Sequence, residues 1–180
     1  MFIWDGTSYG SAIMQNLFPP RSRQGSGRHD IPDRTAVIYC SKSPVSAVAE
    51  VIQGFRGTFL TNRVFLYPGN KVRALAHILL DDSVLLVDLD DPEELSKRQL
   101  NPSQVATMNR QMTQSISRSM FDEGAFGFTW WSTLDASWTN ATLFENRISE
   151  YLSIEDQVLV LEKQMSVVIN ASKALNIQIR

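Results

Sequence analysis

Short apolar runs of strand type alternate with stripes of helical spacing along this chain, and the clearest junction of the two spans residues 35–55. Residues 36–39 are small, β-branched or aromatic, which predicts a mostly buried strand. Ser43 and Pro44 then predict a helix start, because serine can cap the first amides and proline suits the first position. Four apolar residues follow at helical spacing: Val45, Val48, Ala49 and Ile52. The sequence therefore predicts a strand that leads directly into an amphipathic helix.

The same periodicities predict further elements on both sides of this junction. Strands are expected at residues 1–4, 64–67, 72–80, 84–89, 127–132, 140–144, 158–161 and 176–179, and helices from residue 91, over 101–120 and over 162–175. The turn residues 81–83 predict that 72–80 and 84–89 form a hairpin. With no internal repeat or linker, the pattern predicts one α+β domain over residues 1–180, with mixed, mostly antiparallel sheets and flanking helices.

Two patterns inside these elements leave alternatives open. The apolar positions of the predicted 101–120 helix are Val105, Met108, Met112 and Ile116. Their spacing favours a core stripe, with a ligand-binding methionine face as the alternative. Trp130 and Trp131 are neighbours in a predicted strand and must point to opposite faces. One is therefore expected in the core and the other at a surface or cleft.

Composition and charge narrow the class of protein. The hydrophobic fraction of 43% is that of a globular protein, and the net charge of −2 argues against direct nucleic-acid binding. Cys40 is the only cysteine, so no internal disulfide can form. Together with the lack of a signal-peptide pattern, this indicates a cytoplasmic protein. The longest apolar runs, such as 84–87, are too short to cross a membrane.

No single motif identifies a catalytic chemistry. The sequence has no glycine fingerprint for dinucleotides, no phosphate-binding loop and no zinc-ligand spacing, so no metal is expected. His29 and His77 are isolated, and Cys40 has no base near it in sequence, which favours structural roles for all three. Residues 15–33 combine prolines, glycines and arginines. They are either a solvated loop or an anion site, since arginines and glycine amides suit a phosphate.

An ordered set of short segments is more informative than any one of them. Residues 28–33 (RHDIPD) precede the predicted strand that contains Tyr39, and Glu50 follows Tyr39 after eleven positions. Later come VLLVDL at 84–89, GFTWWS at 127–132 and LFENR at 143–147. In this order the segments resemble the RES domain family, whose members show an Arg-Phe-Asp-x-Pro segment, a Leu-Tyr strand, a helix with Ala-x-x-Glu and two later strands.

The resemblance implies a fold like that of ADP-ribosyltransferases and, in characterised members, degradation of NAD. Many members are toxins of toxin–antitoxin pairs that a helix-turn-helix partner protein neutralises. Four residues match family positions: Arg28, Tyr39, Glu50 and Ser132. The chain also departs from the family pattern. RES domains often begin with an aromatic-Arg pair, whereas Trp4 is followed by Asp5 here, and His29 replaces the usual aromatic residue after Arg28.

The chemistry of NAD cleavage assigns a role to each matched residue. Breaking the nicotinamide–ribose bond passes through an oxocarbenium-like state, which a fixed negative charge on Glu50 would stabilise. Ser132 would orient the substrate or the glutamate, and Arg28 would bind the pyrophosphate. Tyr39 and one of the two tryptophans, assigned as Trp131, would stack on a ring. The alternatives are an ADP-ribosyltransferase that acts on a macromolecule and a RES-like interaction module without activity.

Overall fold

The computed structural model describes residues 2–4, 17–67, 71–154 and 158–180, and the chain has an α+β fold, as predicted. Its contacts divide it into two compact units. Unit 1 comprises Met1–Gln15, Ser41–Leu79 and Ser153–Arg180, and unit 2 comprises Asn16–Cys40 and Leu80–Leu152. A single domain over residues 1–180 stays a prediction.

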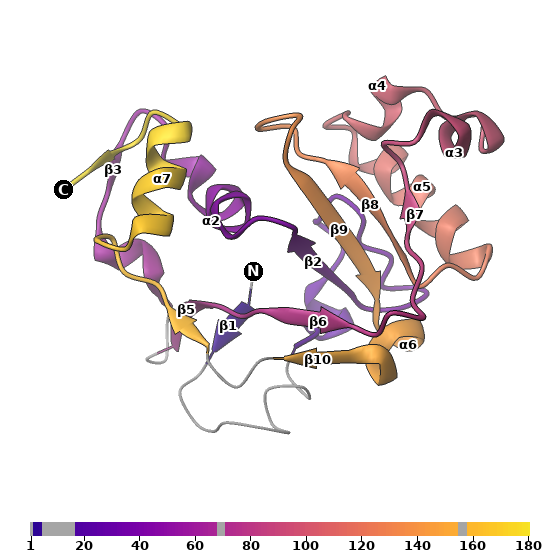
Figure 1. The fold of residues 1–180 in the computed structure, drawn as a ribbon, viewed down its shortest axis with the longest axis horizontal. Helices are drawn as coiled ribbons and strands as arrows, with labels where there is room; N and C mark the ends of the chain where they lie inside the picture. Colours follow the sequence, from indigo (N-terminus) through magenta and orange to yellow (C-terminus); the bar gives the residue numbers. More distant parts are fainter. Residues whose placement is uncertain (1, 5–16, 68–70, 155–157) are drawn as a thin grey trace. The chain divides into compact units, whose positions relative to one another are not determined.

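Unit 2 is built on a four-stranded sheet in the order β2 (Val37–Ser41), β9 (Thr139–Phe144), β8 (Gly127–Trp131) and β7 (Val87–Asp88), as Figure 1 shows. β8 and β9 are antiparallel, with Phe128 opposite Thr142 and Trp130 opposite Asn140. β7 joins the far edge of β8 in parallel. The sequence predicts three of these strands correctly, because their β-branched and aromatic residues are those of half-buried strands.

The helical elements of unit 2 are short, with one exception. They are η1 (Arg21–Arg23), α3 (Pro92–Lys97), α4 (Pro102–Val105), α5 (Arg110–Asp122), α6 (Glu145–Ile148) and η4 (Ser149–Tyr151). The helix predicted over 101–120 is therefore wrong in its middle, since residues 106–109 are not helical. The Asn109 side chain accepts a hydrogen bond from the Met112 N–H and caps a new helix there. Met108, expected in the core stripe, is exposed as a result.

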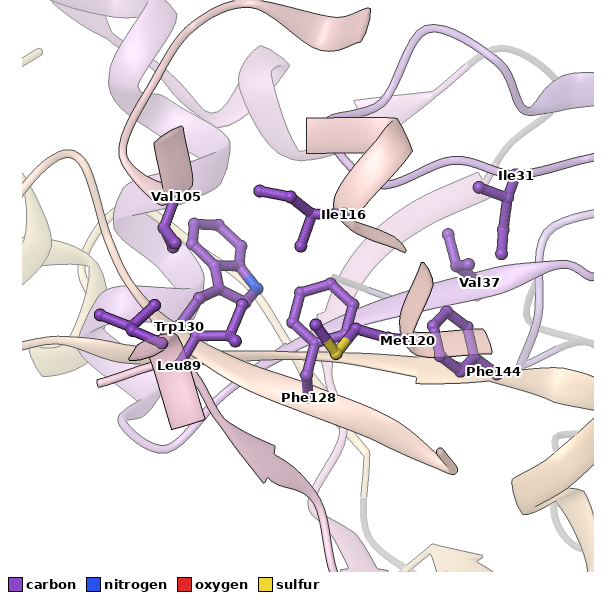
Figure 2. Packing of buried hydrophobic residues seen from close by; sticks show 10 residues of the cluster. Ile31, Val37, Leu89, Val105, Ile116, Met120, Phe128, Trp130 and Phe144 are labelled. Atoms are coloured by element: carbon purple, nitrogen blue, oxygen red, sulfur yellow. The ribbon is translucent and has the colours of Figure 1, made fainter. Parts of the chain in front are cut away.

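The core of unit 2 lies between α5 and the sheet. Ile116 and Met120 of α5 face Phe128 and Trp130 of β8 in Figure 2, and Val37 of β2 belongs to the same cluster. Ile31, from the segment that precedes β2, is also fully buried in it. Burying large apolar side chains of this kind contributes about 1.5–3 kcal/mol each. The cluster therefore fixes both α5 and residues 28–31 against the sheet.

Unit 1 contains the predicted helix after β2. This helix, α2 (Pro44–Ile52), begins at Pro44 with Ser43 as its N-cap residue, and it buries Val48, Ala49 and Ile52 as expected. It packs against α7 (Ser166–Ala174), which is shorter than the predicted 162–175 helix (Figure 1). Among the described residues of unit 1, the remaining helical turns are η2 (Gln53–Phe55) and η3 (Asn62–Phe65).

The strands of unit 1 form small sheets. β5 (Lys71–Leu75) pairs in antiparallel fashion with β1 (Phe2–Trp4), β4 (Leu66–Tyr67) and β11 (Leu159–Val160). β3 (Phe59–Leu60) and β12 (Gln178–Ile179) form a parallel pair. β6 (Ile78–Leu80) and β10 (Leu152–Ile154) form a two-stranded sheet whose residues are divided between the two units. Among the described residues, most strand pairings are antiparallel, as expected.

The predicted hairpin of residues 72–80 and 84–89 is wrong. The turn itself is present, since the Asp81 carboxylate accepts hydrogen bonds from the Ser83 N–H at 2.8 Å and from the Ser83 hydroxyl at 2.5 Å. The chains that leave the turn do not pair with each other, because β6 pairs with β10 and β7 pairs with β8. A turn signal is local, whereas the pairing partner depends on the register of a whole sheet.

Candidate functional site

Asp30 is the centre of a hydrogen-bonded loop that precedes β2. One carboxylate oxygen accepts hydrogen bonds from the backbone N–H groups of Gly25 and Gly27, both at 2.7 Å. The other oxygen accepts from the Tyr39 hydroxyl, also at 2.7 Å. Three donors thus satisfy a buried carboxylate that would otherwise be costly to enclose. Residues 28–31 are buried, so the expectation of a solvated loop is wrong for this part of residues 15–33.

Gly27 is a position where only glycine fits without displacement. A Cβ atom there would lie 2.6 Å from the Tyr39 hydroxyl oxygen and would also meet the Asp30 carboxylate. Neither neighbour can move without breaking the hydrogen bond between them. The close approach of the chain to Tyr39 therefore depends on the missing side chain.

The Tyr39 hydroxyl has two roles inside the protein. It donates to Asp30 and accepts a hydrogen bond from the His29 backbone N–H at 2.8 Å. Burial, the negative charge of Asp30 and the hydrogen bond to it raise the pKa of Tyr39 well above its ordinary value. The hydroxyl therefore stays protonated, and it directs its proton at the Asp30 carboxylate.

His29 is packed into the aromatic core, with 2% of its surface exposed. Its ring lies 4.8 Å from the Phe128 ring and 4.9 Å from the Trp130 ring, both edge to face. Burial and the positive charges of Arg28 and Arg110 hold the pKa of His29 well below its usual range, so the imidazole is neutral.

Thr142 is a polar contact of this imidazole. Its hydroxyl oxygen accepts the Trp130 indole N–H at 3.1 Å and lies 2.8 Å from the His29 Nδ1. The hydroxyl can donate to Nδ1 of one neutral tautomer or accept from the Nδ1–H of the other.

The Arg28 guanidinium forms hydrogen bonds with the chain at the interruption between α4 and α5. One guanidinium nitrogen donates to the carbonyls of Val105 at 3.1 Å and Thr107 at 2.8 Å, which have no helical partner because the helix is interrupted. Its Cζ lies 5.1 Å from the centre of the Trp130 ring, and 8% of the residue is exposed. The guanidinium thus links the loop to the α4–α5 connection, and the prediction that it binds a pyrophosphate stays a prediction.

Side chains on one face of α5 donate hydrogen bonds to the backbone carbonyls of the same loop. The Thr113 hydroxyl donates to the Arg28 carbonyl, and the Ser117 hydroxyl donates to the His29 carbonyl at 2.8 Å. The Gln114 amide donates to the carbonyls of Gly25 and Gly27, both at 3.0 Å. The spacing of these three side chains along the helix places them on one face.

Ser132 directly follows β8 and is 2% exposed. Its N–H donates to the Trp138 carbonyl at 2.7 Å, and its hydroxyl oxygen accepts from the Leu134 N–H at 3.1 Å. It lies two positions after Trp130, on the same side of the strand. Trp130 is buried and Trp131 is half-buried, which confirms that only one of the two lies fully in the core.

The contacts so far place Arg28 and Tyr39 beside the buried side chains around Trp130, and Ser132 follows Trp130 after two positions, in the order that the sequence segments follow. The sequence model of the RES domain matches residues 3–165. The chain belongs to the RES domain family. No curated protein matches the sequence of this RES domain.

Glu50 is the one matched residue of this RES domain that belongs to unit 1. It is half-buried on α2, and one of its carboxylate oxygens accepts a hydrogen bond from the Gln53 side chain at 3.0 Å. Arg28, Tyr39, Trp131 and Ser132 all belong to unit 2. A catalytic role for Glu50 stays a prediction, and Asp5, the departure from the family pattern in the first strand, lies outside the described residues.

Sequence reasoning missed Asn140, which is 2% exposed and lies opposite Trp130 on β9. It is part of the predicted strand 140–144 and also begins an Asn-x-Thr pattern, which such burial makes unsuitable for glycosylation. Alternation along residues 139–144 was the available signal, because it places Asn140, Thr142 and Phe144 on one face. Two polar residues on the core face of a strand indicate a buried hydrogen-bonded site.

Other features of the RES domain bear on its ligands. A surface hollow of about 450 Å³ lies around α6 and η4 and is lined by none of Arg28, Tyr39, Glu50, Trp131 and Ser132. Among the residues that the structure describes, no three His, Cys, Asp or Glu side chains are grouped to hold a metal ion. Within the same residues, no helix combines the length and apolar character that crossing a membrane requires.

Proposed function

We propose that this RES domain consumes NAD by cleaving the bond between nicotinamide and ribose, as an NAD glycohydrolase or phosphorylase with an ADP-ribosyltransferase-like fold. The family match over residues 3–165 is the observation that carries the proposal. The contact of Arg28 with the Trp130 ring and the packing of Tyr39 beside His29 support it, because Arg28 and Tyr39 are positions that the family pattern marks.

The reaction needs little acid–base chemistry. Nicotinamide leaves as a neutral molecule from a cationic precursor, so no general acid has to protonate it. The positive charge that develops on the ribose is stabilised by a fixed negative charge. In this proposal the Glu50 carboxylate supplies that charge and Ser132 orients the ribose or the glutamate.

The remaining roles concern binding of the dinucleotide. Since the Tyr39 hydroxyl is held by Asp30 and His29, the ring of Tyr39 is the part assigned to stacking on the substrate. Trp131, half-buried at the edge of the core cluster, is the second stacking residue. NAD is the substrate in this scheme, and the proposed reaction uses no metal.

The direct test is to incubate the purified protein with NAD and to measure the release of nicotinamide by chromatography. Release that yields ADP-ribose without added phosphate indicates a glycohydrolase, whereas release that depends on phosphate and yields a phosphorylated ADP-ribose indicates a phosphorylase. Modification of an added protein instead indicates an ADP-ribosyltransferase. If none of these reactions occurs, the enzymatic proposal is wrong.

The catalytically inactive interaction module is the second candidate, and one observation favours it. Arg28, the residue matched to the pyrophosphate, is buried and donates to internal carbonyls. In an inactive module, Arg28 would serve to hold the loop in place through these hydrogen bonds. Absence of nicotinamide release together with a stable fold is the result expected of this candidate.

We also propose that the chain acts in the cytoplasm as the toxin of a toxin–antitoxin pair, with a helix-turn-helix protein as its antitoxin. An enzyme that degrades NAD would deplete its own cell without such a partner. Expression of the chain alone is expected to arrest growth and lower cellular NAD. If growth and NAD are unchanged while the purified protein is active, the toxin role is wrong.

A further inference from the structure

We propose that Arg110 binds the pyrophosphate of the NAD substrate, in place of the arginine that the family pattern indicates. The inference rests on the proposed function, because it names a binding residue for that reaction. The first observation is that the Arg28 guanidinium donates hydrogen bonds to carbonyls inside the protein. Turning the Arg28 guanidinium toward a ligand would leave the carbonyls of Val105 and Thr107 without this donor in the interior.

Arg110 belongs to the face of α5 whose side chains contact the same loop. Thr113, Gln114 and Ser117 follow it at three, four and seven positions, which is the spacing of one helical face. All three bind carbonyls of residues 25–29. The Thr113 hydroxyl also lies 3.3 Å from the Arg110 carbonyl, so Arg110 is one turn further along a face that already contacts the loop.

The side chain of Arg110 differs from the others on this face because it is exposed. No hydrogen bond or ion pair joins its guanidinium to any residue that the structure describes. Its charge nevertheless acts on the site, since it contributes to the lowered pKa of His29 and opposes part of the rise in the pKa of Tyr39. A planar guanidinium in this position suits two phosphate oxygens at once.

Most other arginines of unit 2 have partners of their own. Arg21 donates to the Pro32 carbonyl at 2.6 Å, Arg34 pairs with Asp122 at 3.4 Å, and Arg118 pairs with Asp33 at 3.0 Å. Arg98 pairs with Glu94 and Glu123, and Arg147 lies over the Phe121 ring. Arg23 is exposed and forms no side-chain hydrogen bond or ion pair with the described residues, but it is not among the charges that shift the pKa of His29 or Tyr39. Arg23 is therefore a matched control for Arg110.

The experiment measures binding of ADP-ribose, which contains the pyrophosphate and is not consumed, by titration calorimetry. Arg110→Gln is expected to weaken the affinity roughly ten- to hundredfold, the loss typical of one charge-assisted contact. Arg110→Lys is expected to recover part of it, and Arg23→Gln is expected to bind like the unmodified protein. Thermal unfolding of each variant shows whether the fold is retained.

The inference is overturned if Arg110→Gln and Arg23→Gln bind ADP-ribose equally well, or if the unmodified protein does not bind it. The nicotinamide-release assay is read separately. A protein that releases nicotinamide but does not need Arg110 for binding refutes the assignment of Arg110 alone. A protein that needs Arg110 for ADP-ribose but releases no nicotinamide refutes the proposed reaction and leaves the binding residue in place.

Discussion

Replacing Tyr39 by phenylalanine removes one oxygen atom from the centre of the buried network and keeps the ring. The Asp30 carboxylate then loses one of its three donors, and the His29 backbone N–H loses its acceptor. A buried polar group left without its partner costs about 1–3 kcal/mol. Because Asp30 keeps its two glycine amides, we expect the free energy of unfolding to fall by about 2–4 kcal/mol in total.

Urea denaturation measures this loss, and Tyr151→Phe is the matched control in unit 2. Tyr151 packs its ring against Phe126, and its hydroxyl makes no hydrogen bond with the residues that the structure describes, so its removal should change stability by less than about 0.5 kcal/mol. Hydrogen exchange gives a local readout, since the His29 amide should lose protection in Tyr39→Phe. Equal stabilities of the two variants, with unchanged protection of His29, would refute the network as described.

Three further changes test other parts of the molecule. Gly27→Ala should lower the free energy of unfolding by about 1–3 kcal/mol in urea titrations, because its Cβ meets Tyr39 and Asp30, whereas Gly54→Ala, with open space around it, should be neutral. A similar stability of both variants would contradict the close approach at Gly27. The lowered pKa of His29 means that the unfolded chain binds a proton before the folded one does, so stability should fall as the pH drops below about 6.5, by up to about 1.4 kcal/mol per pH unit. His29→Gln should flatten this slope, and an unchanged slope in that variant would exclude His29 as its origin. Glu50→Gln should abolish nicotinamide release and leave the circular dichroism spectrum unchanged. Glu93→Gln, at an exposed position of α3, should retain nicotinamide release. Wild-type turnover in Glu50→Gln would exclude a role for Glu50 in the mechanism.

Local signals predicted elements well where one pattern was sufficient to define them. Ser43-Pro44 marked the start of α2, and the apolar strand residues marked β8 and β9. The break between α4 and α5 was not predicted, because residues 101–120 carry a continuous helical stripe. What stabilises the break includes Arg28, a residue 77 and 79 positions away from the carbonyls that it binds.

The order of family segments predicted that Arg28, Tyr39, Glu50 and Ser132 share a site, and this stays a prediction. Arg28, Tyr39 and Ser132 lie in unit 2, whereas Glu50 lies in unit 1. No periodicity relates Asp30 to Tyr39 or Thr142 to His29, so the network that joins them could not be read from spacing. The side-chain environment of Arg28 was equally hidden, because burial of an arginine depends on acceptors from another part of the chain.

The buried loop also determines how any loss of activity must be interpreted. Residues 25–30 are held through their carbonyls by α5, through their amides by Asp30, and through Arg28 by the α4–α5 connection. A substitution at Arg28, Asp30 or Tyr39 therefore disturbs the fold and the site together, and reduced turnover alone cannot separate the two effects. Arg110 lacks such contacts among the described residues and Glu50 belongs to the other unit, so these two positions offer the cleaner tests of binding and of chemistry. For Arg28, only the affinity measured per folded molecule distinguishes a residue that supports the loop from one that also contacts the pyrophosphate.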